Sequence, residues 1–234
     1  MGSSDEVATG ESEGLIPRFL VDLFENLQAS SDEDNDRLQS WKVKASFLEI
    51  YGEDVYDLTT TAAPACAPAG MPASIAAMLP SDRPSLPVRE DETGRVFVQG
   101  LHEIEVSSTQ EAVDVLSQGS KNRITGATAM NAGSSRSHAV YTIQLEQTLQ
   151  SSTSADDRHQ MQSKLTFVDL AGSERLKRTG AEGQRLKEGI QINSGLFNLG
   201  QVINALADDQ RIKSGNKVGH VPYRNSKLTH LLKV

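Results

Sequence analysis

The 234-residue sequence is poor in cysteine, in aromatic residues and in long apolar runs. Its one cysteine, Cys66, excludes a disulfide within the chain and suits a reducing compartment. No apolar run reaches the roughly 18 residues that a membrane-spanning helix needs. The first 15 residues are polar and acidic, unlike a signal peptide. We therefore expect a cytoplasmic protein without a membrane segment.

Motifs for several kinds of catalytic site are also missing. The five histidines show no metal-ligand spacing, and no Ser-His-Asp or Cys-His nucleophile set is evident. We interpret His138 as a hydrogen-bond partner at the start of a strand rather than as a base. The phosphate-binding motif Gly-x-x-x-x-Gly-Lys-Ser/Thr is absent from the sequence.

Charge is distributed unevenly along the chain. The formal net charge is −8, and residues 1–40 hold ten acidic residues and two arginines. Residues 210–234 hold six lysines or arginines and no acidic residue. This basic end could meet an acidic partner, although a solvated charged surface is an equally good interpretation. No signature of nucleic-acid binding is evident in the segment.

The stretch from Leu165 to Arg175 joins an apolar run to an acid and a small-residue turn. Apolar residues bounded by turn chemistry predict a buried strand over 165–169, with Asp169 at its carboxyl end. An acid there can hold Mg²⁺ directly or through water, and Gly172 lets a backbone N–H approach a phosphate oxygen. The alternative is an ordinary strand followed by a surface turn.

A second polar loop, residues 131–138, precedes an alternating strand-like run over 139–145. It concentrates three serine hydroxyls and the guanidinium of Arg136 in a few residues. Hydroxyls suit Mg²⁺ and phosphate oxygens, and arginine offers a fork that matches a carboxylate. Alone, the loop could simply cap its own backbone. Together, the two loops predict two sensors of one γ-phosphate.

These two loops carry a family resemblance. The run Asn-Ala-Gly-Ser-Ser-Arg-Ser-His at 131–138, followed by Asp-Leu-Ala-Gly-Ser-Glu at 169–174, resembles switch I and switch II of the kinesin motor domain. Further matching pieces follow the same order, at 47–51, 193–200 and 221–229. The resemblance extends from about Gly14 to Leu232. The runs 185–190 and 145–147 resemble the chromokinesin-like class.

The resemblance implies an α/β fold, the three-layer kinesin-type P-loop NTPase fold with a central, mostly β sheet flanked by helices, present only in part. The chain is expected to begin just downstream of its own phosphate-binding loop and to stop before the last strand and helix of the motor. The implied segments are a mobile start at 1–14, an Ala/Pro-rich loop insertion at 59–87, switch I at 131–138, switch II at 169–174, a relay helix at 184–207, and a microtubule-binding loop and helix at 220–232.

The resemblance also implies the cofactors ATP and Mg²⁺. Ser134 would contact the γ-phosphate, Ser135 would bind the Mg²⁺, and Asp169 would hold the Mg²⁺ through water. The Gly172 N–H would sense the γ-phosphate, and Asn131 would belong to the nucleotide site. Arg136 and Glu174 would form the ion pair that closes the site around the attacking water.

The implied partner is the microtubule. Arg224 and Lys227 would face its acidic surface, with Arg175 and Arg178 in the loop before the relay helix. The implied protein works on microtubules of the cytoplasm and dimerises through a stalk outside this segment. Two alternatives stay open at this point, because the phosphate-binding motif is absent. One is a non-catalytic microtubule-binding fragment, and the other is a degenerate kinesin-like product that does not fold stably alone.

Periodicity predicts the remaining elements. Helical spacing from Pro17 to Leu27 predicts one helix, and residues 109–121 predict another, capped by Ser107 or Ser108. Residues 41–58 predict a strand pair or one bent strand. A hairpin over 88–101 is expected to turn at Thr93-Gly94, and a polar hairpin turn is expected at 150–160. Four core positions are expected in the first strand region: Val43, Ala45, Phe47 and Ile50.

Overall fold

The computed structural model describes residues 14–32, 38–60, 84–128, 136–150, 158–172, 184–207 and 220–233. Its helices are α1 (Leu15–Asp32), α3 (Thr109–Thr128), α5 (Gln184–Leu206) and α7 (Lys227–Leu231), with a 3-10 turn η3 (Tyr223–Asn225). Its strands are β1 (Leu38–Tyr51), β2 (Asp54–Asp57), β3 (Val88–Glu90), β4 (Val96–Val98), β5 (Ile104–Val106), β6 (Ser137–Gln150) and β7 (Arg158–Asp169).

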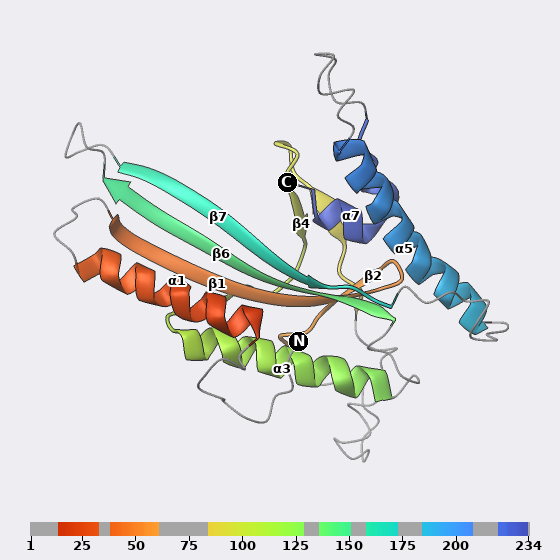
Figure 1. The fold of residues 1–234 in the computed structure, drawn as a ribbon, viewed down its shortest axis with the longest axis horizontal. Coiled ribbons are helices and arrows are strands. Elements are labelled where there is room, and N and C mark those ends of the chain that lie inside the picture. The colour runs from red at the N-terminus through yellow and green to blue at the C-terminus, as the bar shows by residue number, and fades with distance from the viewer. Residues whose placement is uncertain are drawn as a thin grey trace.

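Three long strands dominate the fold. β1, β6 and β7 lie side by side in Figure 1 as one antiparallel sheet in the order β2-β1-β6-β7. β5 pairs with β1 beyond the end of β2, at Val43 to Ala45. A separate two-stranded hairpin joins β3 and β4. The expected central sheet flanked by helices is therefore confirmed.

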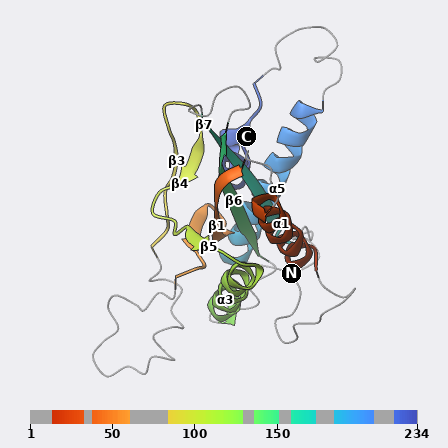
Figure 2. The same cartoon turned by 90° about the vertical axis from the view of Figure 1, so that its left-hand side faces the viewer.

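One face of the sheet packs against α1 and α3, which lie together on the same side of the strands (Figure 1; Figure 2). Side chains alternate between the two faces of a strand, so every second residue of β1 points toward these helices. Val43, Ala45 and Phe47 are fully buried there. They meet the buried residues of α1, which are Leu20, Phe24 and Leu27. The amphipathic spacing of the first helix thus predicted its inner face.

The opposite face packs against the β3–β4 hairpin and α7. The intervening residues of β1, Leu48 and Ile50, enter a second apolar cluster with Val88, Val96 and Leu228. Since Ile50 lies on this face, the four expected core positions of β1 are all buried but divide between two clusters. The sheet is therefore the middle layer of three.

Several boundaries differ from the sequence-based prediction. α1 begins two residues before Pro17, and α3 continues seven residues past Lys121. The hairpin expected to turn over 150–160 is tighter, because Gln150 and Arg158 are already paired across β6 and β7. The strands therefore extend into a segment that was expected to turn, and α3 extends past the residues whose spacing predicted a helix. The pairing of long neighbouring strands overrides weak local propensity here.

The expectation of a strand over 165–169 is confirmed, but the expectation that it is buried is wrong, because none of its five residues is fully buried. β7 is exposed from Arg158 to Leu165 and half-buried from Thr166 to Asp169, and Leu165 itself is 42% exposed. Among the strands that the structure describes, β7 pairs with β6 alone. An apolar run indicates that a strand would gain from being buried, but whether the strand is buried depends on the elements that pack over it.

Two further expectations concern the helix at 184–207 and the insertion at 59–87. α5 ends one residue earlier than expected, and two of its apolar residues, Ile203 and Leu206, are 56% and 48% exposed. Two other apolar residues of α5, Leu199 and Val202, face the interior.

The insertion and the mobile start fall outside the described residues, apart from Gly14 and the margins 59–60 and 84–87. No described helix is long and apolar enough to cross a membrane.

Candidate functional site

The sheet brings the two predicted loops to one end. Because β6 and β7 are antiparallel, the chain enters β6 where it leaves β7, and Ala139 is paired with Asp169. Ser137 and His138 are the first residues of β6 and are buried. Arg136 directly precedes them, and Gly172 follows the end of β7. The end of the first predicted loop, at His138, therefore lies next to the start of the second, at Asp169.

A buried arginine from α3 links these two chain segments. The side chain of Arg123 is 8% exposed, and its Nη1 lies 2.7 Å from Asp169 Oδ2. Its Nη2 donates to the Ser137 carbonyl oxygen at 2.9 Å, and its Nε lies 3.4 Å from the Ser137 hydroxyl. Glu49 of β1 lies behind it, with Oε1 3.9 Å from Nε. One guanidinium thus fixes the start of β6 against the end of β7.

His138 makes a second link between the same segments. Its Nδ1 accepts a hydrogen bond from the backbone N–H of Ala171 at 3.0 Å, which requires the neutral ring with the proton on Nε2. Burial, with the nearby charge of Arg123, lowers the pKa of His138 below its usual value. The prediction of His138 as a hydrogen-bond partner at a strand start is confirmed.

The same histidine lies close to α5. A Cβ built on Gly195 would stand 3.6 Å from His138 Nε2, so the helix backbone passes next to the ring. α5 therefore contacts the start of β6 beside the turn that follows β7. The imidazole therefore lies between the turn that follows β7 and the backbone of α5.

Only part of the predicted nucleotide site can be placed. Asp169 and Gly172 follow one another at the end of β7, and Arg136 precedes β6. The other predicted residues of the site and of its basic loop lie outside the described residues: Asn131, Ser134, Ser135, Glu174, Arg175 and Arg178. Sequence reasoning missed Arg123, because it ended the helix at Lys121, whereas α3 continues to Thr128.

The described residues suit a magnesium nucleotide better than a metal ion alone. Asp169 is a carboxylate whose side chain is 42% exposed despite its contact with Arg123, so its oxygens remain reachable. No group of three or more His, Cys, Asp or Glu side chains in the described part of the chain could hold a metal. Mg²⁺ commonly binds through one or two protein oxygens, waters and substrate phosphates. The donor set at this sheet end fits that pattern.

The second predicted site is the short basic helix near the C-terminal end. Ser226 caps α7 in a capping box, with its hydroxyl accepting from the Thr229 N–H at 3.2 Å. The Lys227 N–H donates to Glu53 Oε2 at 3.1 Å, at the turn between β1 and β2. A helix of five residues gains little from its own hydrogen bonds, so these outside contacts fix its position.

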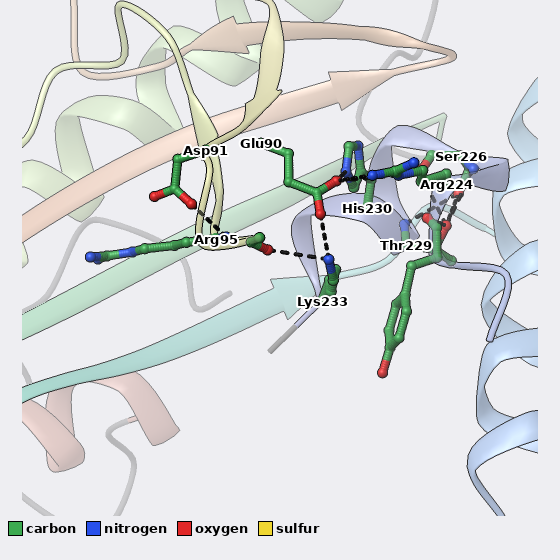
Figure 3. Close-up of polar contacts among 10 residues, drawn as sticks. Glu90, Asp91, Arg95, Arg224, Ser226, Thr229, His230 and Lys233 are labelled. Atoms are coloured by element: carbon green, nitrogen blue, oxygen red, sulfur yellow. Dashed lines mark hydrogen bonds and ion pairs between the residues drawn. The ribbon is translucent and has the colours of Figure 1, made fainter. Parts of the chain in front are cut away.

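One carboxylate gathers the basic side chains around α7 (Figure 3). Glu90 of β3 accepts from Lys233 Nζ at 2.6 Å and from Arg224 Nη2 at 2.7 Å, and its Oε2 lies 3.3 Å from His230 Nε2. These hydrogen bonds, led by the one from Lys233, lower the pKa of Glu90 to about 2. Arg224, predicted to face a microtubule, is therefore ion-paired within the protein while its side chain is 73% exposed.

The depressed pKa of Glu90 predicts an acid-sensitive contact. Because its pKa is lower in the folded protein than the ordinary value of 4.5, the contact contributes fully above about pH 4.5 and is lost as the pH falls toward 2. Glu90→Gln should therefore be less stable than the wild type at pH 6, and this difference should shrink as the pH falls from about 4.5 through 2. Denaturant unfolding across this range measures it. Glu92→Gln, in the same hairpin, is the matched control, and a difference unaffected by pH would contradict the prediction.

Comparison with known proteins gives the family. A family model described as the kinesin motor domain matches residues 1–234. The chain belongs to the kinesin motor domain family. This motor-domain chain is 43% identical over 226 residues to the kinesin-like protein KIN-4C of Arabidopsis thaliana, covering 94% of the chain and 16% of that protein. It is also 43% identical over 220 residues to the human chromosome-associated kinesin KIF4A, covering 94% of the chain and 15% of that protein.

A solved structure supports the same assignment. The kinesin chain aligns with a structure titled as that of a fast kinesin, at a TM-score of 0.71 and 35% identity, covering 97% of this chain and 54% of the other. The chain spans only about a sixth of the length of KIN-4C. The human kinesin-like protein KIF13B is 43% identical as well. Overall identity therefore does not separate a chromokinesin-like class from other kinesins, and that class stays a prediction.

Proposed function

We propose that the protein containing this chain is a microtubule motor that couples ATP hydrolysis to microtubule binding. Family membership supports this proposal, and one observation on the residues of this chain supports it as well. Arg123 and His138 tie the start of β6 to the end of β7, which supports the proposal that the two loops at these strand ends act on one phosphate. Contacts of this kind would couple two loops that are ordered by the same phosphate.

Each predicted residue then has a proposed role. Asp169 would hold Mg²⁺ through water, and Ser135 would bind it directly, while Ser134 and the Gly172 N–H would contact the γ-phosphate. When bound, Mg²⁺ would neutralise charge that develops on the phosphate oxygens. Arg136 and Glu174 would pair across the two loops, and Asn131 would complete the nucleotide contacts.

The residues of this chain supply the switch side of such a site. In this kind of chemistry the protein contributes positioning and electrostatic stabilisation, with little covalent work. Arg123 contributes by holding the Asp169 carboxylate at 2.7 Å. His138 contributes by holding the Ala171 N–H, so the turn after β7 is fixed by its backbone. A neutral buried imidazole performs this role without adding charge next to Asp169.

The proposed filament surface includes Arg224 and Lys227 at α7, with Arg175 and Arg178 before α5. α5 is proposed to act as the relay, since its Gly195 backbone passes His138 and its Asn198 donates to the Asn225 carbonyl oxygen at 3.0 Å. One helix therefore contacts both proposed sites. We further propose that the protein works on cytoplasmic microtubules and dimerises through a stalk outside these 234 residues.

Nucleotide-dependent binding to microtubules tests the proposal. The full-length protein should sediment with stabilised microtubules in the presence of a non-hydrolysable ATP analogue and should be released by ADP. Its ATP hydrolysis should rise with microtubule concentration. Binding that is insensitive to nucleotide, together with no stimulated hydrolysis, would overturn the motor assignment.

A further inference from the structure

The Glu90 cluster is asymmetric in a way that suggests exchange of partners. Glu90, His230 and Lys233 have side chains that are only 17%, 16% and 29% exposed. The side chain of Arg224, by contrast, is 73% exposed although it makes two hydrogen bonds to Glu90, from Nη2 at 2.7 Å and from Nε at 3.2 Å. Arg224 is thus the outer member of an otherwise sheltered cluster.

The inner members do not depend on Arg224. Lys233 uses the other carboxylate oxygen, Oε1, and also donates to the Gly94 carbonyl oxygen at 3.2 Å. His230 approaches Oε2 from α7 itself. If Arg224 swings outward, Glu90 keeps a charged neighbour on one oxygen and a ring nitrogen near the other (Figure 3). Departure of the guanidinium therefore leaves no isolated buried carboxylate, the situation that makes a broken ion pair costly.

We propose that Glu90 holds Arg224 in the free protein and gives it up to a carboxylate of an acidic partner surface, so that docking exchanges one ion pair for another. The inference rests on the proposed function for the identity of that partner, the microtubule. It adds to that function an internal competitor at the binding surface. Arg224 then contributes less to affinity than an unpaired arginine would, because it must first leave Glu90.

The chemistry of the surroundings favours an acidic partner. Residues 210–234 hold six lysines or arginines and no acidic residue, so Glu90 is brought to this basic end from β3 by the fold. The Arg224 end of this ion pair is exposed to water, where such a pair contributes little, and a surface with several acidic side chains can outcompete a single carboxylate. The alternative is a structural ion pair, in which Arg224 stays bound to Glu90 in the complex and only positions α7.

The two accounts predict opposite results for Glu90→Gln. Exchange predicts that microtubule affinity rises about two- to fivefold at low ionic strength, because Arg224 is released in advance. Glu92→Gln removes the same charge from the same hairpin and should raise affinity less. In an Arg224→Gln background, Glu90→Gln should bring no more gain than Glu92→Gln does. A structural ion pair predicts weaker microtubule binding for Glu90→Gln, and that result would overturn exchange. A rise in affinity from Glu90→Gln that exceeds the rise from Glu92→Gln even in the Arg224→Gln background would overturn it equally.

A second variant tests exchange even if the Glu90→Gln protein does not fold. Lys233→Gln leaves Glu90 with fewer cations and a tighter hold on Arg224, so affinity should fall, and the fall should be smaller when Arg224 is already glutamine. An equal fall in both backgrounds would contradict exchange, because Lys233 would then act only through its own charge and not by changing the hold of Glu90 on Arg224. Thermal unfolding of each variant identifies any loss of folded protein before affinities are compared.

Two probes separate this inference from the proposed function. Sedimentation with stabilised microtubules tests both together, whereas binding to poly-L-glutamate tests exchange alone. If the wild type binds poly-L-glutamate but not microtubules, the proposed partner is wrong and the variants decide exchange on the polymer. If it binds neither probe at low ionic strength, the exchange proposal is overturned as well.

Discussion

Replacing Asp169 with asparagine is expected to lower the microtubule-stimulated kcat by about 100-fold or more. The same change is expected to lower the free energy of unfolding by about 2 kcal/mol. The amide is nearly the same shape but cannot offer a charged oxygen to Mg²⁺ or to its water. It also removes the carboxylate charge that faces Arg123 at 2.7 Å, while the guanidinium, 8% exposed, keeps the Ser137 carbonyl oxygen at 2.9 Å and Glu49 at 3.9 Å. Activity and stability therefore fall for two separable reasons.

Two measurements separate those reasons. Steady-state hydrolysis at saturating microtubules reports the loss of activity, and denaturant unfolding reports the loss of stability. Asp114→Asn on α3 is the matched control, because this acid is exposed and its recorded contact is a hydrogen bond from Gln110 at 2.9 Å. Its stability should stay within about 0.5 kcal/mol of the wild type. Normal turnover by Asp169→Asn would refute the metal assignment, and unchanged stability would refute the importance of the Arg123 contact.

The sequence predicts best what depends on short-range pattern. The four core positions expected in the first strand region are all buried, and Thr93-Gly94 marks a turn where Gly94 has a φ of 84°, a value that favours glycine. The helix at 184–207 is placed within one residue at its end. These features are set by neighbours a few residues apart, so a pattern over a short window is enough to find them.

The linking residues of both sites could not be predicted, because their partners lie far away in the chain. Arg123 and Asp169 are 46 positions apart, and Glu90 is 134 positions from Arg224. A charged residue inside a helix is ordinarily read as a solvent-exposed position. Only the antiparallel pairing of β6 and β7, and the packing of the β3–β4 hairpin on α7, bring these charges together.

The exposure of β7 has a different cause. The apolar residues near its carboxyl end were interpreted as a buried strand, and the strand is present and ends at Asp169 as predicted. Tertiary neighbours decide whether such a strand is covered, and among the described strands it has β6 on one side only. Sequence pattern therefore predicted the position of Asp169 at the strand end but not the exposure of the strand that carries it.

Gly119→Ala is expected to destabilise the protein by about 2 kcal/mol, although alanine is the better helix former. A Cβ at position 119 would stand 2.2 Å from Phe47 Cδ1, well inside van der Waals contact. Phe47 is fully buried, and its ring stands edge-on to Tyr141 at 5.6 Å. The Tyr141 hydroxyl donates to the Ala112 carbonyl oxygen at 2.8 Å, so this neighbour is fixed too. With neither ring free to move, α3 must shift away from β1.

A second helical glycine provides the control. A Cβ at Gly200 of α5 would have no atom within 4 Å, so Gly200→Ala should stabilise the protein by about 0.5–1 kcal/mol through helix propensity alone. The melting temperature should therefore fall by about 4–8 °C for Gly119→Ala and rise for Gly200→Ala. Phe47→Leu, which removes the ring, should cost less in the Gly119→Ala background than in the wild type, because the two residues compete for one space. Strictly additive losses would mean that the helix and strand are not in the close contact that the structure shows.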